Sequence, residues 1–396
     1  MKNLEPVPRT SVVSVTGFLD PNETGSIFKS LRDSAGRSIP MQALPPPTQF
    51  GPCCVPWADL TAVLSLPPNG ECLMAYSSDP CNAPNLGFER QLAFIEKLSF
   101  MMFYDDYGTW GFELEKYLHA DCCAERVSVE RIADGPVASV LGATYKLRSS
   151  TIKVEVFRFA GIDELKLKLS IEWWEKDACL KMAYAHGLSD YAFVTGVPGA
   201  ALERHRGTEG LVDHFMEYGT WNGHSFHSEE FSMNEWCALF STSGNAAFFT
   251  PDLHACDYAE GRLRLTLLRS CLYSDHHPFP RNEQTGNMEL GMTFMELWFS
   301  DAPTLDANNI SSICHNRLRG FEVLEVTGHQ SGSEYNLPMC PFALDNDNVQ
   351  LLAAFMDATG RWNVHLLNHG SECTLEFGGK SQSLPAKGIL LWRDGF

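Results

Sequence analysis

Two adjacent carboxylates among aromatic residues are the first candidates for chemistry in this sequence. Asp105 and Asp106 stand beside Tyr104, Tyr107 and Trp110. Aromatic faces stack on the apolar side of pyranose rings, and carboxylates accept hydrogen bonds from sugar hydroxyls. The segment therefore predicts a sugar-binding groove. The alternative is a turn in which the aspartates accept hydrogen bonds from backbone N–H groups.

Two tryptophans and two arginines are further candidates. Neighbouring side chains on a strand point to opposite faces, so we expect one of Trp173 and Trp174 in the core and the other on the surface. Trp174 is taken as the candidate carbohydrate-binding residue. Arg204 and Arg269 stand at predicted strand ends, where they either make structural hydrogen bonds or contact a sugar. Trp236 is expected to fill the core.

No set of residues for catalysis or metal binding is recognisable. His276 and His277 have one nearby acid, Asp275, whereas a zinc site needs three or four ligands. We interpret this segment as a solvated loop. No nucleophile elbow and no phosphate-binding glycine loop are present. The sequence predicts no catalytic residue, no metal site and no cofactor of its own.

The elements that position these side chains belong to a chain of 396 residues, long enough for two or three domains. Hydrophobic residues make up 44% and charged residues 20%, as in folded globular proteins. The net charge of -19 would repel phosphate backbones and anionic headgroups, so nucleic acid and membranes are poor partners. No run of about 18 apolar residues indicates a membrane span.

The cysteines and the N-terminus indicate a cytoplasmic location. There are 13 cysteines, an odd number, and they include two adjacent pairs that do not bridge easily. The first residues contain no apolar stretch of signal-peptide length. Reduced, buried thiols fit this pattern best.

Alternation of apolar and polar residues at period two dominates the sequence and predicts β-strands. Residues 151–160 and 164–174 have this pattern on either side of a short turn, which predicts a hairpin with one buried face. The pattern recurs at residues 262–270, 321–328 and 362–368. These strands lack the alternation with helices that a parallel-sheet enzyme requires.

Helical spacing is found only at residues 88–100, which would also suit a strand or loop. The predicted fold is mainly β, with turn-rich segments dividing the chain into three sandwiches. We expect a small N-terminal sandwich at residues 1–80, a larger central one at 81–300 and a small C-terminal one at 301–396.

Several segments follow one another in a recognisable order. FYDDYGTWGFELEKY (103–117) is similar to an Asp-x-x-Asp-Thr-Trp-Gly stretch, and IEWWEKDACLKMAY (171–184) to an Asp-Trp-x-Glu-x-x-x-x-Leu-Lys strand pair. RDSAGRSIPMQ (32–42) and VTGVPGAALER (194–204) fit strands and turns of the same set. Residues 229–270 follow its longest pattern, which ends in Leu-Arg-Leu-Thr-Leu-Leu-Arg-Ser. Together these segments resemble the C-terminal β-sandwich portion of glycoside hydrolase family 38 α-mannosidases.

The sequence departs from the family at polar positions. The family's Leu-Asn-Asp before a Tyr-Gly turn is replaced at residues 249–254, and its acidic-x-Gly-x-His-Glu run is replaced by residues 282–290. Polar groups that meet sugar in relatives are therefore not assigned to these positions.

The resemblance implies a multi-domain β-sandwich with a central galactose mutarotase-like supersandwich. Family 38 enzymes hold catalytic zinc with two His and two Asp in an N-terminal α/β domain, which the resemblance places before Met1. Zinc is expected only in that domain. The chain is then the non-catalytic portion of a split α-mannosidase in carbohydrate metabolism. Its expected partners are a separate catalytic chain, which would cover an exposed apolar patch, and a mannose-type glycan.

Two other functions stay open. The chain could be a stand-alone carbohydrate-binding module or an inactive gene remnant. A weaker alternative is an aldose epimerase-like enzyme with a His/Glu pair, because the central sandwich resembles mutarotases, but a fold alone does not license that chemistry.

Overall fold

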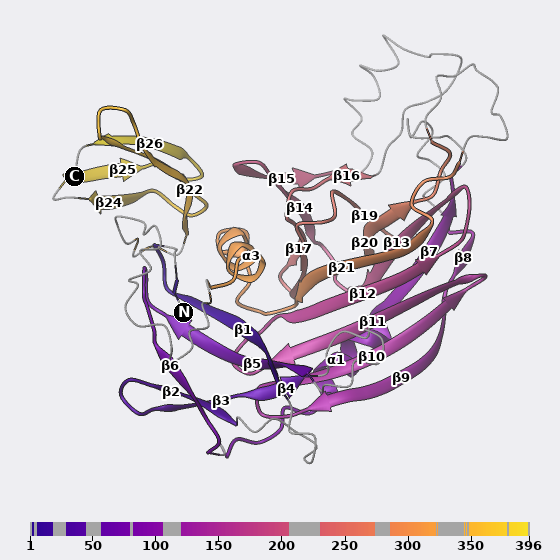
Figure 1. The fold of residues 1–396 in the computed structure, drawn as a ribbon. Coiled ribbons are helices and arrows are strands. Elements are labelled where there is room, and N and C mark those ends of the chain that lie inside the picture. The colour runs from indigo at the N-terminus through magenta and orange to yellow at the C-terminus, as the bar shows by residue number, and fades with distance from the viewer. Residues whose placement is uncertain are drawn as a thin grey trace, which may run out of the picture.

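The chain folds into antiparallel β-sheets that enclose several separate cores. The computed structural model describes residues 2–3, 6–18, 29–44, 57–79, 82–105, 120–205, 230–273, 286–321, 323, 344, 346, 348–377 and 380–394. In this part of the chain strands predominate, and the helices are α1 (Glu89–Lys97) and α3 (Ile310–Leu318) (Figure 1). The predicted mainly β fold class is confirmed. Neither of these helices is long and apolar enough to cross a bilayer.

Two large sheets form the central sandwich. The larger sheet contains, in spatial order, β15 (Ala200–Arg204), β14 (Ala192–Val197), β17 (Trp236–Ser241), β18 (Gly244–Phe249), β21 (Gly291–Ser300), β12 (Leu165–Trp173), β11 (Ser150–Phe159), β10 (Ala138–Leu147) and β9 (Glu125–Asp134). The smaller sheet contains β16 (Phe231–Ser232), β19 (Ala255–Ala259), β20 (Arg262–Arg269), β13 (Ala178–Ala185), β7 (Leu98–Tyr104) and β8 (Cys122–Cys123). We call these the nine-stranded and the six-stranded sheet.

Period-two alternation explains how these sheets pack. On β11, Ile152 and Val154 are fully buried between the sheets while Lys153 is exposed. Strands β11 and β12 pair antiparallel from Thr151 with Glu172 to Arg158 with Leu165, so the predicted hairpin is confirmed. The strands predicted at residues 262–270 and 362–368 are also found, whereas 321–328 lies almost entirely outside the described residues.

The segment with helical spacing is helix only in its first part. Helix α1 buries Phe94 and Ile95 in the central core and ends at Lys97. Leu98 then adopts extended backbone, and β7 follows as an inner strand of the six-stranded sheet. Pairing with β13 therefore makes the second half of this segment a strand.

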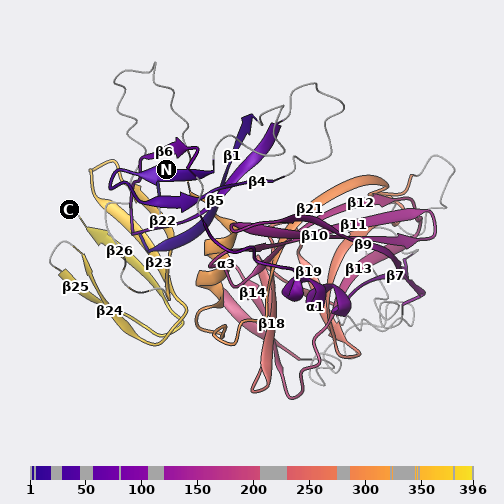
Figure 2. The same cartoon turned by 90° about the horizontal axis from the view of Figure 1, so that it is seen from below.

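The N-terminal strands form two small sheets that pack face to face. One contains β1 (Arg9–Phe18), β5 (Trp57–Leu66) and β4 (Gln42–Leu44), and the other contains β3 (Ser38–Pro40), β2 (Ser30–Asp33) and β6 (Met74–Ser77). Leu31 and Met41 pack against Leu60 and Ala62 between them. Figure 2 shows β1 and β5 extending over the central sandwich.

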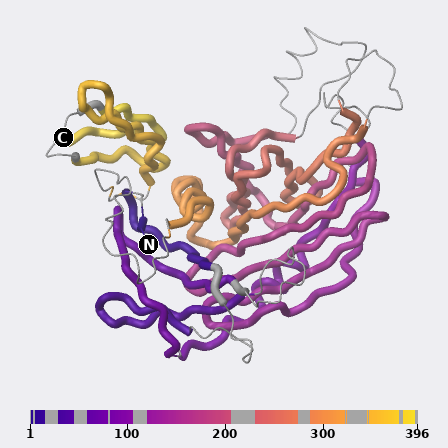
Figure 3. The backbone as a smooth tube through the Cα atoms, in the orientation of Figure 1, coloured from indigo at the N-terminus to yellow at the C-terminus, as the bar shows by residue number. Residues whose placement is uncertain are grey.

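The C-terminal strands form a second small unit next to the start of the chain. Strands β22 (Val349–Met356), β23 (Trp362–Asn368) and β26 (Ile389–Asp394) make one sheet, and β24 (Cys373–Phe377) pairs with β25 (Lys380–Leu384). Val7 packs into this core beside Leu366 and Trp392, and the Leu344 N–H donates to the Pro6 carbonyl at 2.5 Å. Both ends of the described chain therefore lie on the same side of the molecule (Figure 3).

Helix α3 lies at the junction of all three units. Ile310 and Cys314 of α3 pack against Phe249 and Trp298 on the outer face of the nine-stranded sheet, and the same cluster includes Leu44 of β4. A helix end leaves carbonyls without partners. Here the buried Arg9 of β1 supplies donors, to the carbonyls of His315 (2.9 Å) and Arg319 (2.6 Å) and to Asn316 Oδ1 (2.9 Å).

The adjacent tryptophans Trp173 and Trp174 give a direct test of this packing. Trp173 is fully buried and donates from Nε1 to Ser270 Oγ at 3.0 Å, while Trp174 is 50% exposed. We expect Trp173→Ala to lower the free energy of unfolding by about 3 to 5 kcal/mol. The matched change Trp174→Ala should cost about 1 kcal/mol or less. Urea denaturation of both variants measures the difference, and similar losses would contradict the assignment of faces.

Candidate functional site

Two of the predicted site residues, Asp105 and Arg269, lie together at the ends of β7 and β20. Arg269 Nε donates to Asp105 Oδ2 at 2.7 Å, and Arg269 Nη2 donates to Asp105 Oδ1 at 3.0 Å. Asp105 is only 2% exposed, and its backbone N–H donates to the Asp177 carbonyl. This two-pronged ion pair occupies both carboxylate oxygens. Asp105 therefore holds the ends of β7 and β20 together, and its sugar-binding role stays a prediction.

The other predicted site residues are separated from this pair. Arg204 on β15 donates to Thr195 Oγ1 (2.9 Å) and to the Ser232 carbonyl (3.0 Å), which joins β14 to the segment of β16. Half-exposed Trp174 donates from Nε1 to Glu172 Oε1 at 3.2 Å. Asp106 and Trp110 lie outside the described residues. So does the histidine pair at residues 276–277.

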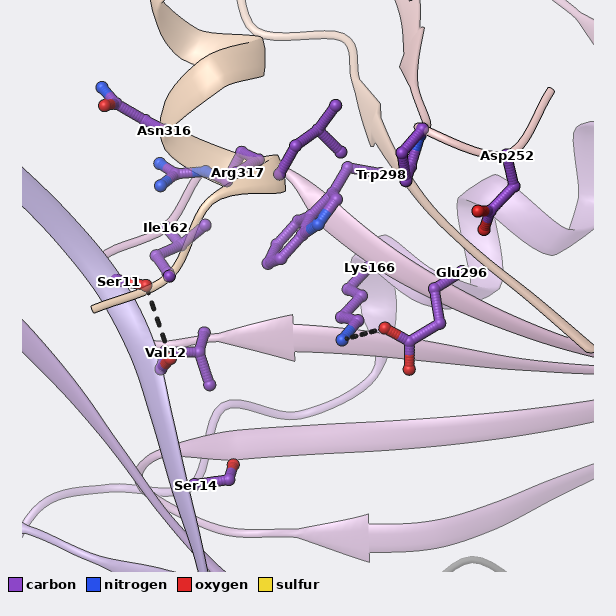
Figure 4. Close-up of a pocket in the computed structure, with 13 residues that line it drawn as sticks. Ser11, Val12, Ser14, Ile162, Lys166, Asp252, Glu296, Trp298, Asn316 and Arg317 are labelled. Carbon is purple, nitrogen blue, oxygen red and sulfur yellow. Dashed lines mark hydrogen bonds and ion pairs between the residues drawn. The ribbon is translucent and has the colours of Figure 1, made fainter. Parts of the chain in front are cut away.

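Sequence reasoning missed a groove between the N-terminal sheet and the outer face of the nine-stranded sheet. Two cavities of about 460 Å³ and 400 Å³ lie there, and both are lined by Val12, Ser14 and Lys166. We call them together the interdomain groove. Figure 4 shows the first cavity, with Ser14 on β1, Lys166 and Glu296 on sheet strands and Arg317 on α3.

One wall of the interdomain groove is a row across five neighbouring strands, four of which contribute a charged residue. Glu130 and Glu155 both pair with Gly142 of β10, Glu155 pairs with Lys168, and Lys168 pairs with Glu296. Opposite charges at directly facing strand positions stabilise one another. At Gly142 a Cβ atom would lie only 2.9 Å from Ile132 Cδ1 and 3.3 Å from Glu130 Oε1. Glycine thus leaves room for the Glu130 side chain to lie over β10.

Lys166 and Lys168 both contact the carboxylate of Glu296, whereas the carboxylate of Glu155 has no partner at such short range. Lys166 Nζ lies 2.7 Å and Lys168 Nζ 3.3 Å from Glu296. Burial alone would raise the pKa of Glu296, but the charges and hydrogen bonds of these two lysines outweigh it and lower the pKa. For Glu155, burial is the largest effect and raises the pKa, Lys168 opposes it and Glu130 adds to it. Two carboxyl groups in one groove therefore titrate differently.

Arg317 of α3 lines the first cavity and ties α3 to its neighbours. Its Nε donates to Glu164 Oε2 at 2.6 Å, and its Nη1 donates to the Thr10 carbonyl at 2.9 Å. The guanidinium also lies 5.8 Å from the ring centre of Trp298, within the range of a cation–π contact. One side chain thus joins α3, β1 and the nine-stranded sheet.

The sequence contained a weak signal for this site. Lys166, Lys168, Glu155 and Glu296 alternate with apolar residues, which is also the pattern of any solvated sheet face. Only the position of β1 and α3 over that face turns it into a groove. Within the described ranges, no three His, Cys, Asp or Glu side chains are grouped as metal ligands.

Comparison with known proteins identifies the fold. Residues 89–277 match the family described as glycosyl hydrolases family 38 C-terminal domain. Two solved structures are similar to the chain: a glycosyl hydrolase family 38 protein from Enterococcus faecalis, and an α-mannosidase from Enterococcus faecalis V583. Each shows 11% sequence identity and a TM-score of 0.66. No curated protein matches the sequence significantly.

Residues 89–277 thus match the family 38 C-terminal domain, and the resemblance seen in the sequence is confirmed. The two similarities cover 99% of this chain, but only 57% and 55% of the Enterococcus chains. This chain therefore spans little more than half the length of those structures.

Opposite pH dependences are expected for two substitutions in the groove. Because the pKa of Glu155 is raised, its ionisation costs stability as the pH rises, and Glu155→Gln should gain thermal stability relative to wild type from about pH 4 to about pH 8. Because the pKa of Glu296 is lowered, its carboxylate stabilises the fold at neutral pH, so Glu296→Gln should lose stability over the same range. Thermal midpoints across this range measure both trends. If the difference in thermal midpoint between variant and wild type changed with pH in the same direction for both variants, the charge row would be assigned wrongly.

Proposed function

We propose that this chain is the β portion of a family 38-type α-mannosidase and that it acts together with a family 38 catalytic module. The observation that carries the proposal is the extent of similarity. Nearly the whole chain aligns with the Enterococcus structures, one of which is an α-mannosidase, while a large part of each of those chains has no counterpart here. Zinc would belong to the catalytic module.

Asp105 and the two groove carboxylates, Glu155 and Glu296, support a non-catalytic role. A retaining glycosidase needs two carboxyl groups about 5 to 5.5 Å apart. Asp105 is bound on both oxygens by Arg269. Glu155 and Glu296 stand on strands separated by β12, which places their backbones about 10 Å apart. Lys168 lies between them and pairs with Glu296.

An exposed apolar patch supports a partner. Trp174, Met292 and Phe294 are 50%, 57% and 52% exposed. Met292 pairs with Glu172, two residues from Trp174, and Phe294 follows on the same face of β21. We call this the β12–β21 patch. Apolar side chains gathered in this way commonly mark protein interfaces, and the proposal assigns the patch to the catalytic module.

Reconstitution tests the proposal. We expect no hydrolysis of an aryl α-mannoside by the purified chain alone, and zinc-dependent hydrolysis when a family 38 catalytic module from the same genome is added. Phe294→Ser should weaken association of the two chains about tenfold, because it removes an apolar contact at the interface. The control Phe355→Ser, on an exposed position of β22, should leave association unchanged.

Two results would contradict the proposal. One is α-mannosidase activity of the chain alone that stops when zinc is chelated. The other is a mixture without activity in which the two chains do not associate.

A carbohydrate-binding role without catalysis is the second candidate, and the interdomain groove is the observation that favours it. The epimerase alternative lacks such support. Among the described residues that line the two cavities there are carboxylates but no histidine to complete a His/Glu pair.

A further inference from the structure

We propose that the interdomain groove binds a neutral oligosaccharide, at a site separate from any active site completed by a catalytic module. This inference does not rest on the proposed α-mannosidase role. It rests on the size of the groove, the charges along its walls and the groups left available for hydrogen bonding.

The size of the groove fits a ligand longer than one sugar ring. Its cavities measure about 460 Å³ and 400 Å³, and each alone is within the usual range of small-molecule sites, about 300 to 1,000 Å³. Because both are lined by Ser14 and Lys166, they adjoin. They extend from Asp252, after β18, across the sheet to Glu130 on β9.

The charges along the groove favour a neutral ligand. Its acidic lining residues are Asp59, Glu130, Glu155, Asp252 and Glu296. Its basic lining residues are Arg131, Lys166, Lys168 and Arg317. These charges are interspersed, so an anionic ligand would meet carboxylates and a cationic ligand would meet lysines at close range. A neutral ligand with many hydroxyl groups can donate to the carboxylates and accept from the amines at the same time.

Hydrogen-bonding capacity is available on both walls. Among the described residues, Glu155 has no hydrogen-bond or ion-pair partner, although Lys168 lies near enough to influence its pKa. Glu296 keeps 53% of its side chain exposed despite its lysine contacts. On the opposite wall, exposed Ser14 of β1 lies 3.0 Å from Thr61 of β5, oxygen to oxygen. Half-buried Glu155 can accept a hydrogen bond from a sugar hydroxyl.

The groove is also preorganised. Arg317 fixes α3 to β1 and to Glu164 before any ligand arrives, so binding need not order these elements. Trp298 is only 7% exposed and is covered by Arg317 and Lys166. It therefore forms an apolar wall instead of an open stacking surface, and recognition depends mainly on hydrogen bonds.

The test blocks the groove without touching a buried residue. Ser14→Ile adds bulk where the two cavities meet, and isoleucine is well suited to a strand. The matched control is Ser65→Ile on β5: exposed Ser65 also makes a hydroxyl contact across the same strand pair, with Thr10 at 2.7 Å, but does not line either cavity. Isothermal titration calorimetry of the whole chain with linear mannotetraose and cellotetraose measures binding.

We expect saturable binding of at least one neutral tetrasaccharide by the wild type and by Ser65→Ile. Ser14→Ile should weaken it about tenfold or more, and Glu155→Gln should weaken it about three- to tenfold through loss of a charged hydrogen-bond acceptor. Binding that is equal in Ser14→Ile and Ser65→Ile would place the sugar elsewhere and overturn the proposal, as would the absence of binding. Tighter binding of tetragalacturonate or chitosan tetramer than of the neutral sugars would overturn the assigned ligand class. None of these outcomes depends on α-mannosidase activity.

Discussion

The contacts of Arg317 determine how helix α3 and the N-terminal strand β1 are joined to the nine-stranded sheet. Its guanidinium donates to Glu164, just before β12, and to the Thr10 carbonyl of β1, and it lies over Trp298. Glu164 is only 3% exposed, and breaking a buried ion pair on one side leaves an uncompensated charge. Helix α3 and β1 are therefore held at one place on the nine-stranded sheet, and the interdomain groove follows from that placement.

Strand β21 shows how one sheet face serves three purposes. Its outward side chains are Trp298, Glu296, Phe294 and Met292, in that order away from α3. Trp298 is covered and belongs to the apolar junction, whereas Glu296 lines the groove. Phe294 and Met292 are exposed and form the β12–β21 patch with Trp174. Successive outward residues of this one strand thus pack between domains, line the proposed ligand groove and form the proposed partner surface.

The sequence predicted local structure and family well, because both depend on patterns within short segments. Period-two alternation located the β11–β12 hairpin and the two faces of Trp173 and Trp174. The usual burial of tryptophan predicted that of Trp236, which is 4% exposed. Asp105 and Arg269 were named separately, but their pairing joins residues 164 positions apart. The charged groove residues were unrecognisable because Lys166 and Glu296 look like any solvated strand face until β1 is placed above them. No local pattern encodes that long-range placement.

The central claim is that one outer face of the nine-stranded sheet supports a catalytic module at the β12–β21 patch and keeps a separate polar groove beside it. A crystal structure of the chain bound to a family 38 catalytic module tests this most directly. The account predicts that Trp174, Met292 and Phe294 are buried beneath the module while the groove around Ser14 and Glu155 remains open to solvent. A complex in which the module fills the groove and leaves Trp174, Met292 and Phe294 exposed would contradict it.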